Sequence, residues 1–577
     1  MSTGYVPSPQ PPPDPPRTPP GTTAPPEPVA PYATEATRLL CAGTYIDPEY
    51  RDRVIDELYL LKHRFAAPSL GFDAARVLAH ALRARRVETA WAGGVLALLT
   101  VGAVASGWWL LILVVPGLLL TFGRLLRGTG GDQLVRRRLP AFGLRWAGRL
   151  LLALLVFNSL GVGLGLIDPD GRDDDSGKPL LGILTTVRDF LRPESAPAAW
   201  LALAALLAMA GCVAGQQTHF VRVLRGELSP RHFPNAADDP AEHTGGRRFQ
   251  QVKKRIRAEQ HAPVVMYHEA HPFLGSGTAY DTWVLAVELR PDPAKERRPI
   301  GNETVLTAVR PFLEQLREPA EWAEREGRVV RDRLRGLRID ECVFLPAEGL
   351  PRREDAPYGR DSFELNRTRA VEEGGEKRRH FLRIGVGGWD EELVVTVFVR
   401  VHTQGRMLML EVAPHVLFPV RADFKDADHE AYAFTDQNAF GKTVHILTRM
   451  AGAPGQALVT LGRPAVRGWR RLTGEFAAGA PEGPAVSVRE LAAEPGGSLF
   501  QTMDVDRYLR SVQDRIAYGV TRALADAGYQ TDEFVQKVIH ISNGGVNIES
   551  MEGSALAVGQ YARATAANGD AGAKGVR

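Results

Sequence analysis

The strongest pattern along the chain is a block of apolar residues between about 88 and 217, with polar or mixed sequence on both sides. Four apolar runs within it predict membrane-spanning helices over about 88–105, 107–123, 150–167 and 197–215. The first two runs are nearly continuous, and as one helix they would extend roughly 50 Å, against a hydrocarbon core of about 30 Å. We therefore expect two helices here, with a turn at Ser106-Gly107.

The charged flanks of these runs predict the topology. Arginines gather in 83–86, 124–138 and 222–231, whereas the acidic segment 168–175 follows the third run. Positive residues mark the cytoplasmic side of a membrane helix. Four crossings with both termini in the cytoplasm place every arginine-rich segment inside the cell and the acidic segment outside. We therefore expect a multi-pass protein of the cell membrane.

The predicted membrane helices have no ionisable residue near their centres, and Asn158 is the most polar central residue. Pumps and channels usually have ionisable groups at bilayer depth. Small residues such as Gly161, Gly163 and Ala204 suit close helix packing or a homo-oligomer. An anchor or packing unit is therefore favoured over a conduit.

The rest of the chain divides by composition. Prolines dominate 1–34, which predicts a disordered tail, or alternatively a polyproline ligand for an SH3- or WW-like domain. In the outer loop, about 168–196, helical spacing of apolar residues indicates a short surface helix or a simple connector. The other predicted units are cytoplasmic helices over 35–87 with a start at Asp47-Pro48, the membrane region 88–217, a linker over 218–247, a cytoplasmic domain over 248–550 and a flexible tail over 551–577.

Within 248–550, β-rich runs and amphipathic runs are mixed without regular alternation. That mixture predicts an α+β fold, so the whole chain is expected to combine an α-helical membrane region of four transmembrane helices with a cytoplasmic α+β domain. The clearest hairpin turns around Gln404-Gly405. Strands are predicted over 262–268, 281–289, 339–347, 391–418 (the hairpin) and 534–541, and helices over 302–316, 319–334 and 504–529.

Composition narrows the chemistry. The net charge of +3 gives no reason to expect nucleic acid as a partner. The three cysteines, Cys41, Cys212 and Cys342, are far apart and form no metal-binding or disulfide spacing. We expect no metal and no cofactor.

One loop is a candidate binding site. His268 and His271 are three residues apart and Pro272 follows, so the helical zinc motif, with its four-residue spacing, does not fit. Gly275 and Gly277 could let a phosphate approach the backbone, although no Lys-Ser/Thr follows, and a structural turn is the alternative. The candidate loop comprises His268, His271, Gly275 and Gly277.

Two charged segments suggest other ligands. A basic cluster next to the membrane could bind anionic lipid headgroups, or form a solvated helix face. The acidic segment 421–430 could hold a divalent cation, although the calcium-loop spacing is absent and a solvated loop or helix start is the alternative. The basic cluster consists of Lys253, Lys254, Arg255 and Arg257.

The order of a strand, then HPFLGSG, then the Trp-bearing strand DTWVLAVEL resembles uncharacterised multi-pass membrane proteins of high-GC bacteria. The resemblance covers residues 260–290 and the general layout, and it implies no activity.

No catalytic constellation stands out in the sequence. The favoured hypothesis is a non-enzymatic, membrane-anchored cytoplasmic binding or regulatory module. The alternatives are a membrane-tethered enzyme with its site near the 268–277 loop, and a small transporter or channel.

Overall fold

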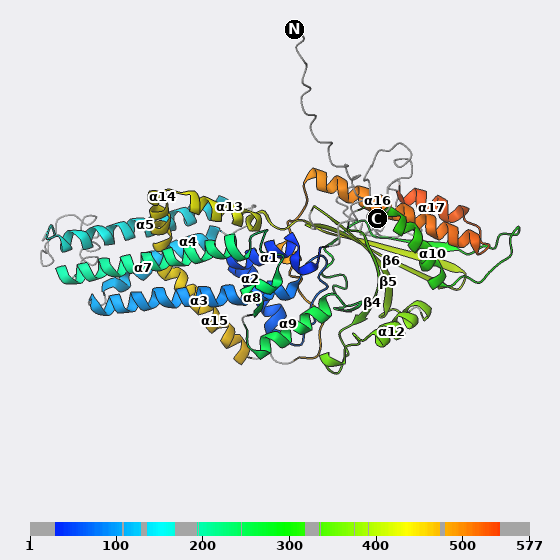
Figure 1. The fold of residues 1–577 in the computed structure, drawn as a ribbon, viewed down its shortest axis with the longest axis horizontal. Coiled ribbons are helices and arrows are strands. Elements are labelled where there is room, and N and C mark those ends of the chain that lie inside the picture. The colour runs from blue at the N-terminus through cyan, green and yellow to red at the C-terminus, as the bar shows by residue number, and fades with distance from the viewer. Residues whose placement is uncertain are drawn as a thin grey trace, which may run out of the picture.

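The computed structural model describes residues 29–106, 109–127, 135–167, 193, 195–243, 245–317, 334, 336–373, 375–389, 392–473 and 479–542. It has three parts: a helical bundle, a helical lobe next to it, and a domain built on a curled sheet (Figure 1). The bundle and the sheet lie at opposite ends, with the helical lobe between them.

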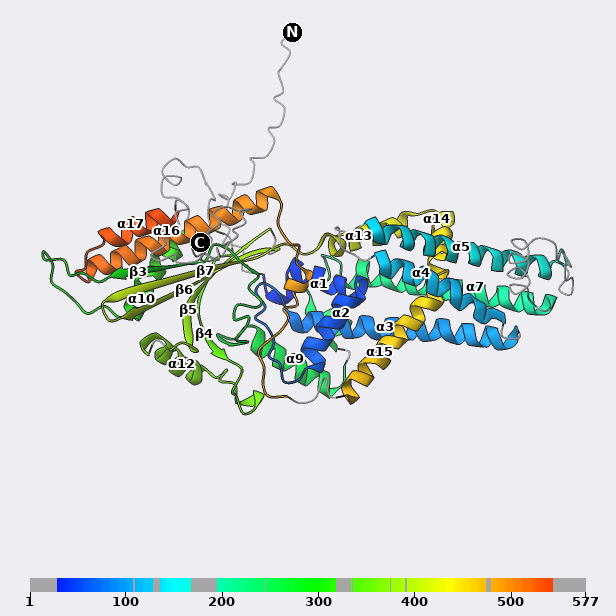
Figure 2. The ribbon, with the colours of Figure 1, turned by 180° about the vertical axis from the view of Figure 1, so that it is seen from behind.

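Long apolar helices form the bundle and lie side by side in both views (Figures 1 and 2). In the part of the chain that the structure describes, three of them, over Ala74–Ala105, Leu139–Gly163 and Ala196–Glu227, are long and apolar enough to cross a membrane. The fourth apolar helix, Trp109–Gly123, is shorter. Its first residues, Trp109–Leu113, are a 3₁₀-helix. The four bundle helices are α3 (Ala74–Ala105), α4 (Val114–Arg127), α5 (Val135–Gly163) and α7 (Ala196–Arg222).

The helix α3 is longer than the membrane helix predicted over 88–105. The Asp73 side chain caps α3 by accepting the N–H groups of Ala75 and Arg76, and the helix then continues without a break to Ala105. The predicted boundary at 87/88 is therefore interior to one helix, since nothing in Arg83–Glu88 disfavours helical geometry. Ser106 follows α3, while Gly107 and Trp108 lie outside the described residues.

The helical lobe joins distant segments in one apolar core. It comprises α1 (Glu35–Ile46), α2 (Pro48–Ile55), the first turns of α3, α8 (Pro240–His243), α9 (Arg247–Gln260) and α13 (Ala422–Asp436). As predicted, Asp47 caps α2 ahead of Pro48. A Cβ on Gly43 would lie 2.2 Å from the Phe424 ring, so α1 and α13 meet at a glycine.

A buried ion network inside the lobe joins the segment before α8 to the first turns of α3. Asp239 accepts hydrogen bonds from Nε and Nη2 of Arg76, at 2.9 and 2.8 Å, and lies 3.0 Å from Nε2 of His80. The three side chains are 3% exposed or less. Burial alone would raise the pKa of Asp239, but the His80 hydrogen bond and the Arg76 charge hold that pKa well below its usual range.

After α13 the chain returns to the bundle. The helix α14 (Ala439–Met450) packs on α7. The helix α15 (Ala453–Leu472) packs on α3 and α4. In both views α15 crosses α3 at an angle (Figures 1 and 2). A segment from the middle of the predicted cytoplasmic domain thus packs against the apolar helices.

Within the described residues the sheet has seven strands. In order across the sheet they are β1, β4, β5, β6, β7 and β2, and β3 also pairs with β7. Among these described strands, only β1 and β4 pair in parallel. As predicted, β6 and β7 form a hairpin, with Gly405 at φ +62° in the turn. The strands are β1 (Val264–Tyr267), β2 (Thr278–Ala279), β3 (Trp283–Glu288), β4 (Arg338–Pro346), β5 (Arg379–Gly388), β6 (Leu393–Gln404) and β7 (Met407–Leu417).

Helices cover the sheet face that is turned away from the helical lobe. Here α10 (Asn302–Glu314) and α16 (Leu499–Asp526) pack apolar residues such as Val309, Leu509 and Ile516 on alternate residues of β5, β6 and β7. Burying each such side chain contributes about 1.5–3 kcal/mol. The remaining helices of this domain are α12 (Arg360–Glu372) and α17 (Asp532–Ser542).

Some sequence predictions for this domain were wrong or missed an element. The predicted strand 534–541 is the helix α17, in which Phe534 and Val538, one helical turn apart, pack on the core. The strand β5 and the helices α12, α14 and α15 were not predicted. The predicted helix 319–334 lies almost entirely outside the described residues, as do the outer-loop helix and most of both tails.

Candidate functional site

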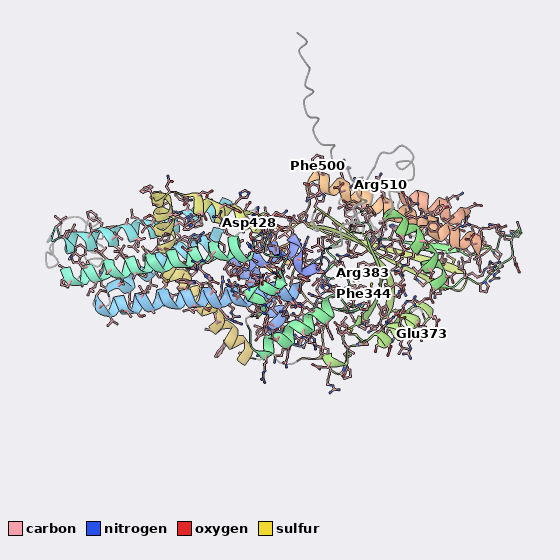
Figure 3. The ribbon with its side chains drawn as sticks, viewed as in Figure 1. Phe344, Glu373, Arg383, Asp428, Phe500 and Arg510 are labelled. Carbon is pink, nitrogen blue, oxygen red and sulfur yellow. The ribbon has the colours of Figure 1, made fainter. Side chains whose placement is uncertain are left out.

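Strand alternation places polar residues on the sheet face that is turned toward the helical lobe. Val395 and Val397 of β6 belong to the core under α16, so Thr396 between them points the opposite way. The register pairs Thr396 with Gly385 of β5, and Arg383 with Asp340 of β4. Asp340, Arg383 and Thr396 therefore share one face, and Arg383 lies between the sheet and the lobe (Figure 3).

A cavity of about 300 Å³ opens between this face and the helical lobe. The sheet contributes Arg338, Asp340, Arg383, Gly385 and Thr396. The lobe contributes the loop before α3 and the end of α9, with Gly71, Gln260 and His261. A Cβ on Gly385 would meet nothing within 4 Å, so this glycine widens the cavity.

The cavity combines positive charge with an unsatisfied hydroxyl. The Arg383 guanidinium donates to both carboxylate oxygens of Asp340, at 2.6 and 3.0 Å. Thr396 is 1% exposed, and its Oγ1 has no hydrogen-bond partner among the described residues. Burial lowers the pKa of His261, and the nearby Arg338 and Arg383 charges lower it further against the opposing effect of Asp73.

These groups suit a small anion. Arginine forks bind carboxylate and phosphate oxygens through paired hydrogen bonds. The volume is at the lower end of the range of small-molecule sites. Within the described part of the chain, no three His, Cys, Asp or Glu side chains lie close enough together to hold a metal ion.

The predicted loop 268–277 lies beside this cavity and does not line it. Its Phe273 ring packs 4.6 Å from His415, the cross-strand neighbour of Thr396, and also contacts Phe344 and Phe398. This aromatic contact anchors the loop to the sheet.

An internal carboxylate occupies the glycine turn of the loop. The N–H groups of Gly275 and Gly277 donate to Oε1 of Glu490, at 2.8 and 2.9 Å. A Cβ on Gly277 would lie 2.2 Å from the Val416 carbonyl oxygen, and its φ of +95° also favours glycine. The glycine turn is therefore occupied by a side chain of the same chain, and binding of an external ligand by Gly275 and Gly277 stays a prediction.

The two histidines of the loop have local contacts. Nδ1 of His268 accepts the Ala270 N–H at 3.1 Å, and its Nε2 lies 3.7 Å from Glu348. The rings of His268 and His271 stack with their centroids 6.5 Å apart. A binding or catalytic role for these histidines stays a prediction.

The predicted lipid-binding cluster on α9 is largely engaged within the protein. Lys253 pairs with Glu242, and Arg257 pairs with both Asp73 and Glu242. Arg255 lies 4.0 Å from Glu259, whereas Lys254 is exposed. Binding of lipid headgroups here stays a prediction, and it would compete with these ion pairs.

A second polar cluster lies between β4, β5 and α12. The carboxylate of Glu341 is 3.1 Å from Nε2 of His380 and pairs with Arg367, and these contacts lower the pKa of Glu341 to about 2 against the effect of burial. The adjoining cavity is only about 70 Å³. The charges are paired, so this cluster is best explained as an ion network that holds α12 to the sheet.

Sequence reasoning missed the residues of the cavity between the sheet and the helical lobe. Arg383 lies in HFLRIGVGG, whose three glycines do not favour a β-strand. The apolar residues Leu382, Ile384 and Val386 nevertheless alternate with other residues, as in a half-buried strand. Thr396 resembles any threonine in a β-strand. The sequence indicated a special role for Thr396 only through its position between Val395 and Val397, and its pairing with Gly385 is known only from the structure.

Residues 282–555 match the family model of the AbeC-like domain. The matched segment begins before β3, contains Asp340, Arg383 and Thr396, and also includes α13, α14 and α15. The side of the cavity that belongs to the helical lobe lies before it. No curated protein and no solved structure matches the chain. The likeness to membrane proteins of high-GC bacteria stays a prediction.

Proposed function

We propose that the protein is a membrane-anchored binding module that holds a small anionic ligand between the sheet and the helical lobe. Thr396 is the observation that carries this proposal. Its hydroxyl is buried in a cavity wall without a partner among the described residues. An unsatisfied buried polar group costs roughly 1–3 kcal/mol, which a bound hydrogen-bonding ligand would offset.

The lining defines the ligand class. Arg338 and Arg383 favour a phosphate or carboxylate group, and Asp340 can accept a hydrogen bond from a donor on the same ligand. Because the cavity is made by two parts of the fold, binding would fix the sheet domain against the membrane-bound lobe. That coupling is what a regulatory module requires. The two alternative functions, a membrane-tethered enzyme and a small transporter or channel, stay predictions, and no contact among the described residues supports either of them.

Replacing Thr396 tests the ligand cavity. We expect nucleoside monophosphates or dicarboxylates to raise the unfolding temperature of the full chain in detergent, measured over a concentration series. Thr396→Val and Arg383→Gln should weaken that effect by about tenfold to a hundredfold, the range for losing one hydrogen bond to a charged group. Thr403→Val, on the same strand outside the cavity, is the matched control. Equal responses from Thr396→Val and Thr403→Val, or no response to any probe, would rule the cavity out.

We also propose four membrane crossings, with both termini in the cytoplasm. The 3₁₀-helix Trp109–Leu113 continues directly into α4, and the apolar stretch Trp109–Gly123 extends about 25 Å, somewhat less than the hydrocarbon core of about 30 Å. Reporter fusions after Arg127 and Arg225 should give a cytoplasmic signal, and a fusion at Asp174 an exterior one. An exterior signal at Arg127 would leave three crossings.

A further inference from the structure

The helices α14 and α15 form a hairpin that leaves the helical lobe, runs onto the bundle and returns to the lobe. The chain leaves the lobe through α13, whose residues Phe424 and Ala427 belong to the lobe core. It comes back beside α2, where Arg463 of α15 lies 3.8 Å from Asp52. In both views α14 and the start of α15 lie beside the bundle helices (Figures 1 and 2). The hairpin therefore follows the apolar helices and has both of its ends at the lobe.

The turn of the hairpin contacts the apolar part of the bundle. Gly455 packs on the backbone of Gly117, which lies six residues before the end of the apolar stretch Trp109–Gly123, or about 9 Å along the helix. Met450 and Ala457, on the two sides of the turn, are buried in the apolar core of the bundle. In a membrane-anchored protein these contacts place the turn in the hydrocarbon region.

The sequence of the turn suits this position. Residues 450–462 contain no ionisable side chain. An apolar run of about 10–14 residues is too short to cross a bilayer, but is typical of a re-entrant segment. The run is followed by arginines, which favour the cytoplasmic side, where the proposed topology places the lobe. These arginines are Arg463, Arg467, Arg470 and Arg471.

The backbone of the turn meets the main requirement of membrane depth. Ala451, Gly452 and Gly455 are buried within the protein. The N–H groups of Ala451 and Gly452 donate to the carbonyl oxygens of Leu447 and Arg449, at 3.3 and 3.1 Å. Backbone outside a regular helix is tolerated at this depth only where protein surrounds it and its polar groups are paired.

The exposed face of α14 is apolar. Phe440 is 81% exposed, and Val444 and Leu447, which follow at helical spacing, are more than 40% exposed. The structure describes every side chain of α14, and the exposed ones include no ionisable group. A helix with one face in water normally has charged residues there. This face is therefore expected to contact lipid.

The two threonines on this face bind the backbone of their own helix. Oγ1 of Thr443 donates to the Ala439 carbonyl oxygen at 2.9 Å, and Oγ1 of Thr448 donates to the His445 carbonyl oxygen at 2.8 Å. Such bonds satisfy a hydroxyl without water, as is required in lipid. The polar groups of the exposed face are thus compatible with a bilayer.

We infer that α14 and α15 form a re-entrant hairpin, which enters the membrane from the side of the helical lobe and contacts phospholipid acyl chains through the exposed face of α14. On α15, Trp469 is 68% exposed beside the arginines, as tryptophans are at the headgroup level. The inference rests on the proposed membrane anchoring and is independent of the ligand between the sheet and the lobe. Part of the segment that matches the AbeC-like domain is then embedded in the membrane.

Photo-crosslinking in a bilayer tests the contact with lipid. The full chain is reconstituted in nanodiscs of phosphatidylglycerol and phosphatidylcholine, with p-benzoylphenylalanine placed at one position at a time. We expect phospholipid adducts, detected by mass spectrometry of the intact chain, from probes at Phe440 and Leu447. A probe at Leu365, which is 53% exposed on α12 of the sheet domain, should give none. A probe at Leu207, which is 73% exposed on α7, reports on the anchored bundle.

A charge on the same face provides a second readout. Leu447→Asp would place a carboxylate among acyl chains, so the adduct yield from the probe at Phe440 should fall by about tenfold or more. Leu365→Asp is the matched control, and it should leave that yield unchanged.

The outcomes separate the hairpin from the anchor. Adducts at Leu207 without adducts at Phe440 and Leu447 would overturn the inference and leave the membrane anchoring intact. If Leu207 gives none either, the anchoring itself is wrong, and the hairpin falls with it. Adducts between two chains at Phe440 would also contradict the inference, because a second copy of the protein would then cover this face.

Discussion

Asp239→Asn should destabilise the helical lobe by about 3–5 kcal/mol, the usual cost of breaking a buried ion pair. Arg76 directs two nitrogens at Asp239, and its side chain is 1% exposed, so in this variant its charge stays buried without an anion at that position. Arg76 is further held by the Tyr32 carbonyl and by the Phe233 ring, which keep it from moving out to water.

The same network predicts a dependence on pH. The pKa of Asp239 is lowered in the folded state, so its contribution to stability is complete above the unfolded pKa, near 4, and is lost as the pH falls through the folded value. The difference between the protein and Asp239→Asn should therefore be largest near neutral pH and should shrink below about pH 4.

Pulse proteolysis of the full chain in detergent, over a urea series, measures both effects. Asp526→Asn is the control, because its pair with Arg522 is about 60% exposed on both sides and such pairs contribute roughly 0–1 kcal/mol. If Asp239→Asn behaves like Asp526→Asn at pH 7, the network does not hold the lobe together.

The sequence predicted best where one physical demand dominates. A bilayer requires long apolar segments, so the helices that contain Val95, Leu155 and Leu206 were visible from hydropathy alone. The hairpin of β6 and β7 was equally clear, because alternating valines and one glycine turn leave few other conformations. The segment Phe534–Ile541 was predicted as a strand but is helical, because a short apolar run with Phe534 and Val538 is compatible with either conformation.

The parts that were missed depend on tertiary contacts. In α15 the apolar residues are separated by glycine, proline and arginine, so its mean hydropathy is too low to indicate a membrane contact. Only the fold brings Thr460 to Glu88 and Arg449 to Gln217. Likewise Thr396 becomes a candidate ligand contact only when β5 places Gly385 beside it and the helical lobe covers both.

Gly455→Val should detach α15 from the bundle. A Cβ at Gly455 would lie 2.3 Å from the Gly117 carbonyl oxygen and 2.7 Å from the Leu118 nitrogen, so the two backbones are in direct contact. Small residues at such crossings are what allow membrane helices to pack closely. Overpacking of this kind costs about 1–3 kcal/mol, and more when backbone must move.

Hydrogen exchange of the full chain in nanodiscs checks this prediction, because backbone amides of α15 lose protection when the helix leaves its partners. Gly462→Val, in the same helix, is the control, since a Cβ there would meet nothing within 4 Å. Faster exchange over Ala453–Leu472 is expected for Gly455→Val alone. Equal exchange in the two variants would mean that the Gly117–Gly455 contact does not hold α15 on the bundle.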